Sequence, residues 1–153
     1  MDSYAAIQQS PAYIIVSLVV AIIGIIANWK IFTKAGEKGW KSIIPIYNGY
    51  TSYKLFWNVK MFWITLVLAF AMGISIGIAG AAYAMGSMVA YLALMIVYLA
   101  ILVAMVVITI IQMHKMSKSF GHGAGFTVGL IFLGIIFVLI LAFGKSEYKK
   151  LEN

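Results

Sequence analysis

The stretch MVAYLALMIVYLAILVAMVVITIIQM, from Met88 to Met113, carries no charged side chain in 26 residues. A helix rises 1.5 Å per residue, so about 20 apolar residues cross the hydrocarbon core of a bilayer. Apolar helices in the core of a soluble protein are usually shorter than this. The stretch therefore predicts a transmembrane helix.

Three further apolar stretches of similar length accompany it, at residues 12–32, 61–83 and 123–144. The first contains one charged residue, Lys30, near its end, and the other two contain none. Backbone groups in lipid must be hydrogen-bonded within the protein, and no alternating strand pattern is present, so these stretches are expected to be helical. The sequence predicts an all-α integral membrane protein, a four-helix bundle formed by residues 1–153 as one membrane domain. Its four transmembrane helices are expected at 12–32, 61–83, 88–113 and 123–144.

Composition excludes the main alternatives. The 153 residues are 64% hydrophobic and 10% charged, with a mean hydropathy of +1.04, whereas soluble domains are about half apolar and one-quarter charged. The net charge of +7 comes from eleven lysines that flank apolar stretches. Lysines in these positions indicate insertion topology and contact with anionic lipid headgroups, not a nucleic-acid partner.

The lysines also predict an orientation. Eight of them adjoin the segments between the first and second or the third and fourth stretches: Lys30, Lys34, Lys38, Lys41, Lys54, Lys60, Lys115 and Lys118. The positive-inside rule then makes both segments cytoplasmic and puts both termini outside, with a first helix that is retained and not cleaved as a signal peptide. Three lysines of the C-terminal tail, at 145, 149 and 150, oppose this orientation. The use of Lys without Arg and the abundance of Ile indicate an AT-rich bacterial genome, hence a bacterial cytoplasmic membrane.

Residues 33–60 are too aromatic for a plain connector. Trp40, Ile43, Ile44 and Tyr47 have the spacing of one helix face. Pro45 interrupts the segment, and Asn48 is placed to cap a second short helix over 49–57. The segment is expected to form one or two amphipathic helices in the cytoplasmic interface, while a re-entrant path or a substrate gate for 40–57 stays open. The residues expected to matter are Trp40, Lys41, Pro45, Tyr47 and Asn48.

Small residues recur every four positions in the second apolar stretch, at Ala69, Gly73, Gly77 and Ala81. This spacing lets two helix backbones approach closely in a membrane. The predicted partner is another helix of the chain or another subunit, including a second copy.

Few residues are candidates for proton transfer, metal binding or catalysis. The cores of the four stretches hold no ionisable residue, which disfavours a proton relay or an ion pump. His114 and His122 have no acid nearby, and two histidines make a poor zinc site. Lys41 beside Ser42 does not by itself form a Ser–Lys dyad, since the lysine must also be desolvated. No catalytic residue, metal site or cofactor is therefore expected, and an enzyme is disfavoured.

Several motifs resemble an uncharacterised family of small bacterial membrane proteins. They include the run from Trp29 to Gly36, the stretch Gly39-Trp-Lys-Ser-Ile-Ile-Pro-Ile-Tyr-Asn48, and the closing run from Phe143 to Tyr148. Further matches are Ser117–Gly121, Gly125-Phe126 and Gly129–Phe132. In some members this module precedes a signal-peptidase-type domain, which residues 1–153 do not contain. The resemblance implies a helical membrane module of unknown function and supplies no catalytic residues.

Two functions remain in view. The favoured one is a non-enzymatic accessory, scaffold or immunity-type subunit of a bacterial cytoplasmic membrane system, which contacts other membrane proteins or copies of itself. The alternative is a small oligomeric channel or facilitator for a neutral or weakly charged solute, lined by hydroxyls such as those of Ser75 and Thr109.

Overall fold

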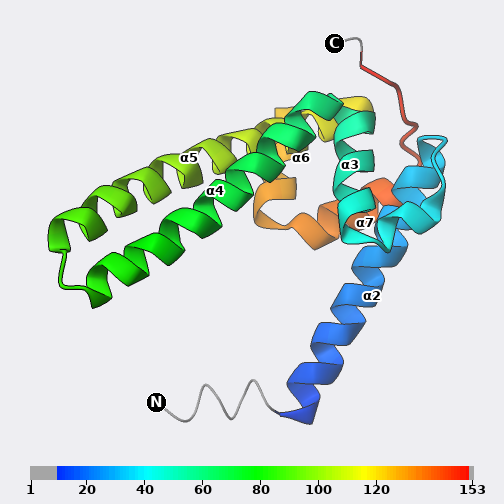
Figure 1. The fold of residues 1–153 in the computed structure, drawn as a ribbon. Helices are drawn as coiled ribbons and strands as arrows, with labels where there is room; N and C mark the ends of the chain where they lie inside the picture. The colour runs from blue at the N-terminus through cyan, green and yellow to red at the C-terminus, as the bar shows by residue number, and fades with distance from the viewer. Residues whose placement is uncertain (1–9, 152–153) are drawn as a thin grey trace.

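The computed structural model describes residues 10–151, and this part of the chain is all helical, without strands. The all-α prediction is confirmed for these residues. In chain order (Figure 1) the elements are α2 (Pro11–Lys34), the 3-10 helix η1 (Gly39–Ser42), α3 (Pro45–Phe56), α4 (Val59–Ala84), α5 (Met88–Ser119), α6 (Ala124–Phe132) and α7 (Gly134–Phe143).

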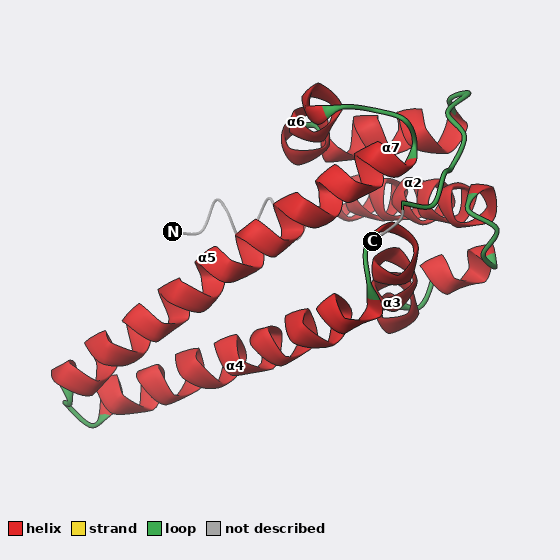
Figure 2. Cartoon of the chain, turned by 90° about the horizontal axis from the view of Figure 1, so that it is seen from above, coloured by secondary structure: helices red, strands yellow, loops and turns green. Residues whose placement is uncertain are grey.

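Three of these helices, α2, α4 and α5, are long and apolar enough to cross a membrane. They have 24, 26 and 32 residues, and they contain the stretches 12–32, 61–83 and 88–113. Their lengths indicate a multi-pass membrane protein. α4 and α5 form an antiparallel hairpin, closed by a turn in which Gly86 adopts a positive φ of 75°. Figure 2 shows the two helices close together at this turn and diverging towards their other ends.

The prediction of one continuous helix over 123–144 is wrong. The backbone breaks at Leu133 (φ −125°, ψ 42°), which separates α6 from α7. These helices have nine and ten residues, so each is only about 14–15 Å long, half the thickness of a bilayer core. They pack closely because Gly129 has no side chain: a Cβ there would lie 2.2 Å from the Phe137 ring. Length and hydropathy alone do not distinguish such a hairpin from one spanning helix.

The packing is not that of a four-helix bundle within residues 10–151. α2 packs mainly against η1 and α7, whereas α6 packs against α5. The α6–α7 hairpin therefore connects α2 to the α4–α5 pair, and the long helices diverge from this junction (Figure 1).

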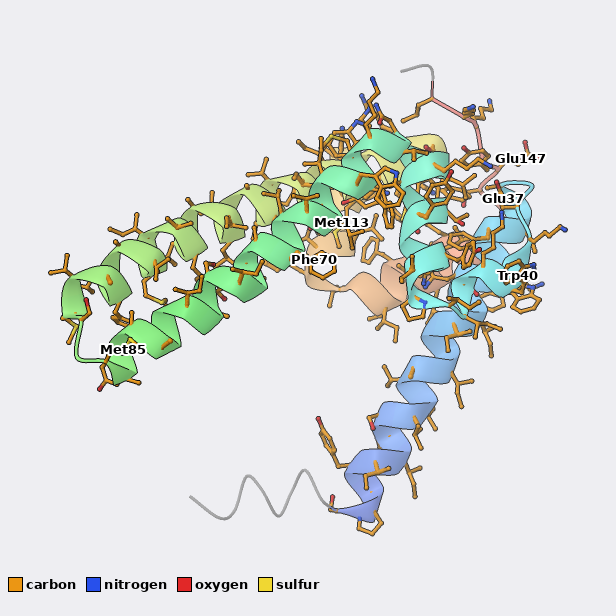
Figure 3. All side chains as sticks on the ribbon, in the orientation of Figure 1. Glu37, Trp40, Phe70, Met85, Met113 and Glu147 are labelled. Carbon is orange, nitrogen blue, oxygen red and sulfur yellow. The ribbon has the colours of Figure 1, made fainter. Side chains whose placement is uncertain are left out.

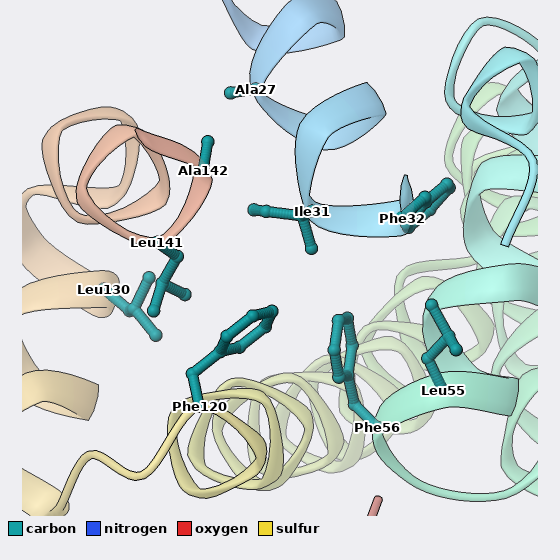
Figure 4. Packing of buried hydrophobic residues seen from close by; sticks show 9 residues of the cluster. All are labelled: Ala27, Ile31, Phe32, Leu55, Phe56, Phe120, Leu130, Leu141 and Ala142. Carbon is teal, nitrogen blue, oxygen red and sulfur yellow. The ribbon is translucent and has the colours of Figure 1, made fainter. Parts of the chain in front are cut away.

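The buried core lies at one end of the molecule, where the short and long helices meet. Figure 4 shows this cluster, to which α2, α3, α6, α7 and the residue that caps the end of α5 contribute. Its members are Ala27, Ile31, Phe32, Leu55, Phe56, Phe120, Leu130, Leu141 and Ala142. We call this the basic end, because all eleven lysines lie in or beside the segments that meet there.

The C-terminal tail also lies at the basic end. The Tyr148 hydroxyl donates a 2.7 Å hydrogen bond to the backbone oxygen of Leu55, and the Lys149 amide donates one of 2.7 Å to that of Ser119. In Figure 3, Glu147 and Glu37 lie near each other, far from Met85 at the α4–α5 turn. The tail and the basic segments thus meet at one end of the described chain, whereas the predicted orientation put them on opposite sides of the membrane. Two short helices in place of one long one, with the end of α7 held against α2, bring the chain back to the basic end.

Candidate functional site

Lys34 joins the last turn of α2 to the end of α7. Its ammonium donates hydrogen bonds of 2.8 Å to the backbone oxygen of Leu141 and 2.7 Å to that of Gly144. A longer contact of 3.5 Å reaches the oxygen of Ser146. The last carbonyls of a helix have no partner within the helix and carry the negative end of its dipole, so a cation is favourable there. Lys34 therefore holds the α6–α7 hairpin against α2.

The segment between α2 and α3 folds back along α2. α2 is followed by a residue in the left-handed conformation, Gly36 (φ 79°), and the chain then runs back along the helix. The Ser42 hydroxyl donates a 3.4 Å hydrogen bond to the backbone oxygen of Ile25, nine residues before the end of α2. Nine helical residues correspond to about 13 Å along the axis. Gly39 is buried against Trp29, and a Cβ on Gly39 would lie 2.2 Å from the indole nitrogen.

The five residues expected to matter in this segment lie around the bend between η1 and α3. Trp40 and Tyr47 contact each other edge to face, with ring centroids 5.6 Å apart. Pro45 is the first residue of α3, where a missing amide hydrogen costs nothing. Asn48 is not an N-cap, contrary to the prediction, because α3 begins before it. Its amide donates a 3.2 Å hydrogen bond to the Ser42 backbone oxygen and so supports the bend.

Apolar side chains project outward at this bend. Ile43, Ile44 and Ile46 are 53%, 42% and 69% exposed, and Trp40 and Tyr47 are about half exposed. A contiguous exposed apolar patch in a folded protein marks contact with a membrane or a partner. Because the bend lies beside the middle of α2, this patch is placed to contact lipid or a neighbouring helix.

Glu37 is the centre of an ionic cluster above the bend. Its carboxylate accepts hydrogen bonds of 2.6 Å from Lys41 and 2.6 Å from Lys54. The hydrogen bond from Lys41, followed by that from Lys54, lowers the pKa of Glu37 from 4.5 to about 2. In turn, the hydrogen bond from Glu37 raises the pKa of Lys54. Lys41 thus ties η1 to the end of α2, and Lys54 ties α3 to the same carboxylate, a partner that sequence spacing did not reveal for Lys54.

α4 has two small-residue faces on opposite sides. Ser75 and Ala79 are 6% and 1% exposed and face α5, with the partly buried Ala71 one turn before them. They have the same spacing of four as the predicted face, so the sequence pattern contained a signal for this contact as well.

The predicted face, Ala69, Gly73, Gly77 and Ala81, is exposed along its whole length. A Cβ on Gly73 or Gly77 would meet no atom within 4 Å. The face is therefore not used in packing within residues 10–151. Its role in contacting another chain stays a prediction.

An apolar groove of about 340 Å³ runs between α5 and α6. Its lining residues are Met105, Val106, Thr109, Ile110, Met113 and Ile131. The Thr109 hydroxyl, the polar group of this wall, donates a 2.8 Å hydrogen bond to the Met105 backbone oxygen. Ser75 donates a 2.9 Å hydrogen bond to the backbone oxygen of Met72 and is not among the residues that line this groove.

The histidines are part of the packing at the basic end. The Nδ1 atom of His114 lies 3.0 Å from the hydroxyl oxygen of Thr127 and links α5 to α6. His122 stacks on Phe126 at a centroid distance of 4.2 Å. Residues 10–151 contain no group of three or more His, Cys, Asp or Glu side chains arranged to hold a metal ion.

A family model covers most of this architecture. Residues 40–150 match the family of unknown function DUF5684. The chain belongs to this family. The DUF5684 region runs from Trp40 in η1 through the α4–α5 pair and the α6–α7 hairpin into the tail, and it leaves out α2. No curated protein and no solved structure matches the chain.

Proposed function

We propose that this protein is a non-enzymatic accessory subunit of a bacterial cytoplasmic membrane system, of the scaffold or immunity type, which acts by binding other membrane proteins. The observation that carries the proposal is the open face of α4, where both glycines of the Gly73–Gly77 pair meet no other side chain. In lipid, helices associate through close packing of such small residues. The opposite face of α4 is already occupied by α5, so a second helix has a separate place to bind.

The basic end is proposed to face the cytoplasm. This placement follows from the positive-inside rule, with all eleven lysines on one side and none near the α4–α5 turn. The N-terminus is then outside and the C-terminal tail inside. α2, α4 and α5 span the membrane, while 38–56 and 124–143 enter it from the cytoplasmic side and return. The tail lysines, which opposed an orientation with both termini outside, agree with this one.

Cysteine labelling tests the orientation cleanly, since the chain has no native cysteine. Ser87→Cys in the α4–α5 turn and Glu147→Cys in the tail are both exposed positions. A membrane-impermeant maleimide added to intact spheroplasts should label Ser87→Cys alone. After permeabilisation it should label both. Labelling of Glu147→Cys in intact spheroplasts would show that the tail is outside.

Native mass spectrometry of the protein, gently extracted from its own membrane, tests the function. The wild type should emerge with another polypeptide bound, and Gly77→Leu should lose that polypeptide. The control is Ile78→Leu, a conservative change at an exposed neighbouring position. A closed homo-oligomer without other polypeptides would contradict the accessory role and favour the channel alternative, to be followed by a flux assay in proteoliposomes.

A further inference from the structure

Lys118 follows the groove along α5, five residues or about 8 Å after Met113, the last lining residue on that helix. His114 on α5 pairs with Thr127 on α6, and one turn deeper Ile110 and Ile131 line the groove. Lys118 lies one turn after His114 along α5, away from the groove. Its backbone oxygen accepts a 2.9 Å hydrogen bond from the amide of Gly121, in the loop that leads to α6. Lys118 is exposed. Val106, Ile110, His114 and Lys118 thus form one row with a spacing of four along α5, apolar at one end and cationic at the other.

The depth of the groove matches one leaflet. Lys118 and Ile110 are eight residues apart, about 12 Å along α5, and Met105 lies about 20 Å from Lys118. The hydrocarbon of one leaflet is about 15 Å thick. With Lys118 at the level of the headgroups, the groove lies where the acyl chains of that leaflet run.

We propose that the groove binds one acyl chain of an anionic phospholipid from the bilayer, with the phosphate held by the ammonium of Lys118. The wall is apolar and its one hydroxyl, that of Thr109, is bonded within the helix, so an acyl chain leaves no polar group without a partner. The lysines of the basic end favour an anionic headgroup over a zwitterionic one. The proposal rests on the membrane placement given above, but it needs no protein partner.

The test uses the full-length chain reconstituted in bilayers of phosphatidylcholine and phosphatidylglycerol. A phosphatidylglycerol probe with a photoreactive diazirine on its acyl chain is crosslinked, and the adducts are mapped by mass spectrometry. Adducts should concentrate on the groove residues of α5 and on Ile131. Thr109→Trp fills the groove and should remove most of them. Val103→Trp, at an exposed position on α5 outside the groove, should leave them unchanged.

Lys118→Gln keeps the groove and removes the charge, and its exposed position spares the fold. It should lower the preference for the phosphatidylglycerol probe over a matched phosphatidylcholine probe about fivefold. Equal labelling along the whole of α5, or an equal preference in wild type and Lys118→Gln, would overturn the proposal. A co-purified polypeptide that blocks labelling of the groove would overturn it too, while supporting the accessory role.

Discussion

The ammonium of Lys34 donates a 2.8 Å hydrogen bond to the backbone oxygen of Leu141, 107 residues later in the chain. With the bond to Gly144, this contact fixes the end of α7 to the end of α2. It also accounts for the position of the tail, because a helix held in this way returns the chain to the basic end. One lysine therefore helps to bring residues 144–149 of the tail to the basic end.

Lys34→Met should loosen this junction. The substitution keeps the side-chain length but leaves two partly buried carbonyl oxygens without their charged donor, at a cost of about 1–3 kcal/mol. A lower midpoint of thermal unfolding in detergent is expected, with faster maleimide labelling of Ser146→Cys in the Lys34→Met background. Lys38→Met, at an exposed position, serves as the control. Equal midpoints for the two variants would rule out a structural role for the Lys34 contact.

Gly39→Ala should destabilise the fold of residues 38–56 against α2. The new methyl group would overlap the indole of Trp29, and overpacking of this kind costs about 1–3 kcal/mol. Thermal unfolding measures the effect. Gly24→Ala in α2, the helix that carries Trp29, adds a methyl group where no atom lies within 4 Å, so its midpoint should not fall.

A double-mutant cycle identifies the cause. Trp29→Ala removes the ring that the new methyl group would strike, so Gly39→Ala should be nearly neutral in that background. Additive effects of the two substitutions would mean that the glycine is needed for some reason other than the indole.

Sequence patterns predicted the three long helices, because an apolar stretch of about 20 or more residues with at most one charge near its end has few other stable forms. The patterns did not predict the two short helices over 123–144, because a pair of short helices and one spanning helix can have the same apolar composition. The difference arises from packing that the pattern does not contain, the Gly129–Phe137 contact and the Lys34 bonds. In 33–60 the spacing predicted that Trp40 and Tyr47 lie on one face, and their rings are indeed in contact, although the two residues belong to separate elements. Whether the segment lies on the membrane or re-enters it depends on Gly39 and Ser42 contacting α2.

Stability should depend on pH through Glu37. Its pKa is about 2 in the folded chain, against an ordinary value of 4.5. A carboxyl group with a lowered pKa stabilises the fold fully above pH 4.5, and this contribution is lost as the pH falls from 4.5 towards 2. The thermal midpoint of the wild type should therefore fall over that range, and Glu37→Gln should reduce the fall. Glu147→Gln, an exposed acid in the tail, should keep the wild-type profile. A Glu37→Gln profile parallel to the wild type would show that the Lys41 and Lys54 bonds do not contribute to stability.

The two faces of α4 predict opposite results for similar substitutions. Ala79→Leu places three extra carbons where the side chain is 1% exposed against α5, so the isolated chain should lose stability by about 1–3 kcal/mol. Gly73→Leu places a larger side chain on the open face and should leave the thermal midpoint of the isolated chain unchanged or slightly raised, because leucine favours a helix over glycine.

Binding of another polypeptide should be more sensitive to Gly73→Leu than to Ala79→Leu, the reverse of the order expected for thermal stability. Gly73→Leu blocks close approach of a second helix, so the protein extracted from its membrane should lose the polypeptide bound to the open face, as judged by native mass spectrometry. A loss of thermal stability in Gly73→Leu without any change in bound polypeptides would mean that this face packs within the chain after all. The pair of measurements therefore separates folding of the α4–α5 hairpin from recognition by another chain, which a single glycine substitution would leave confounded.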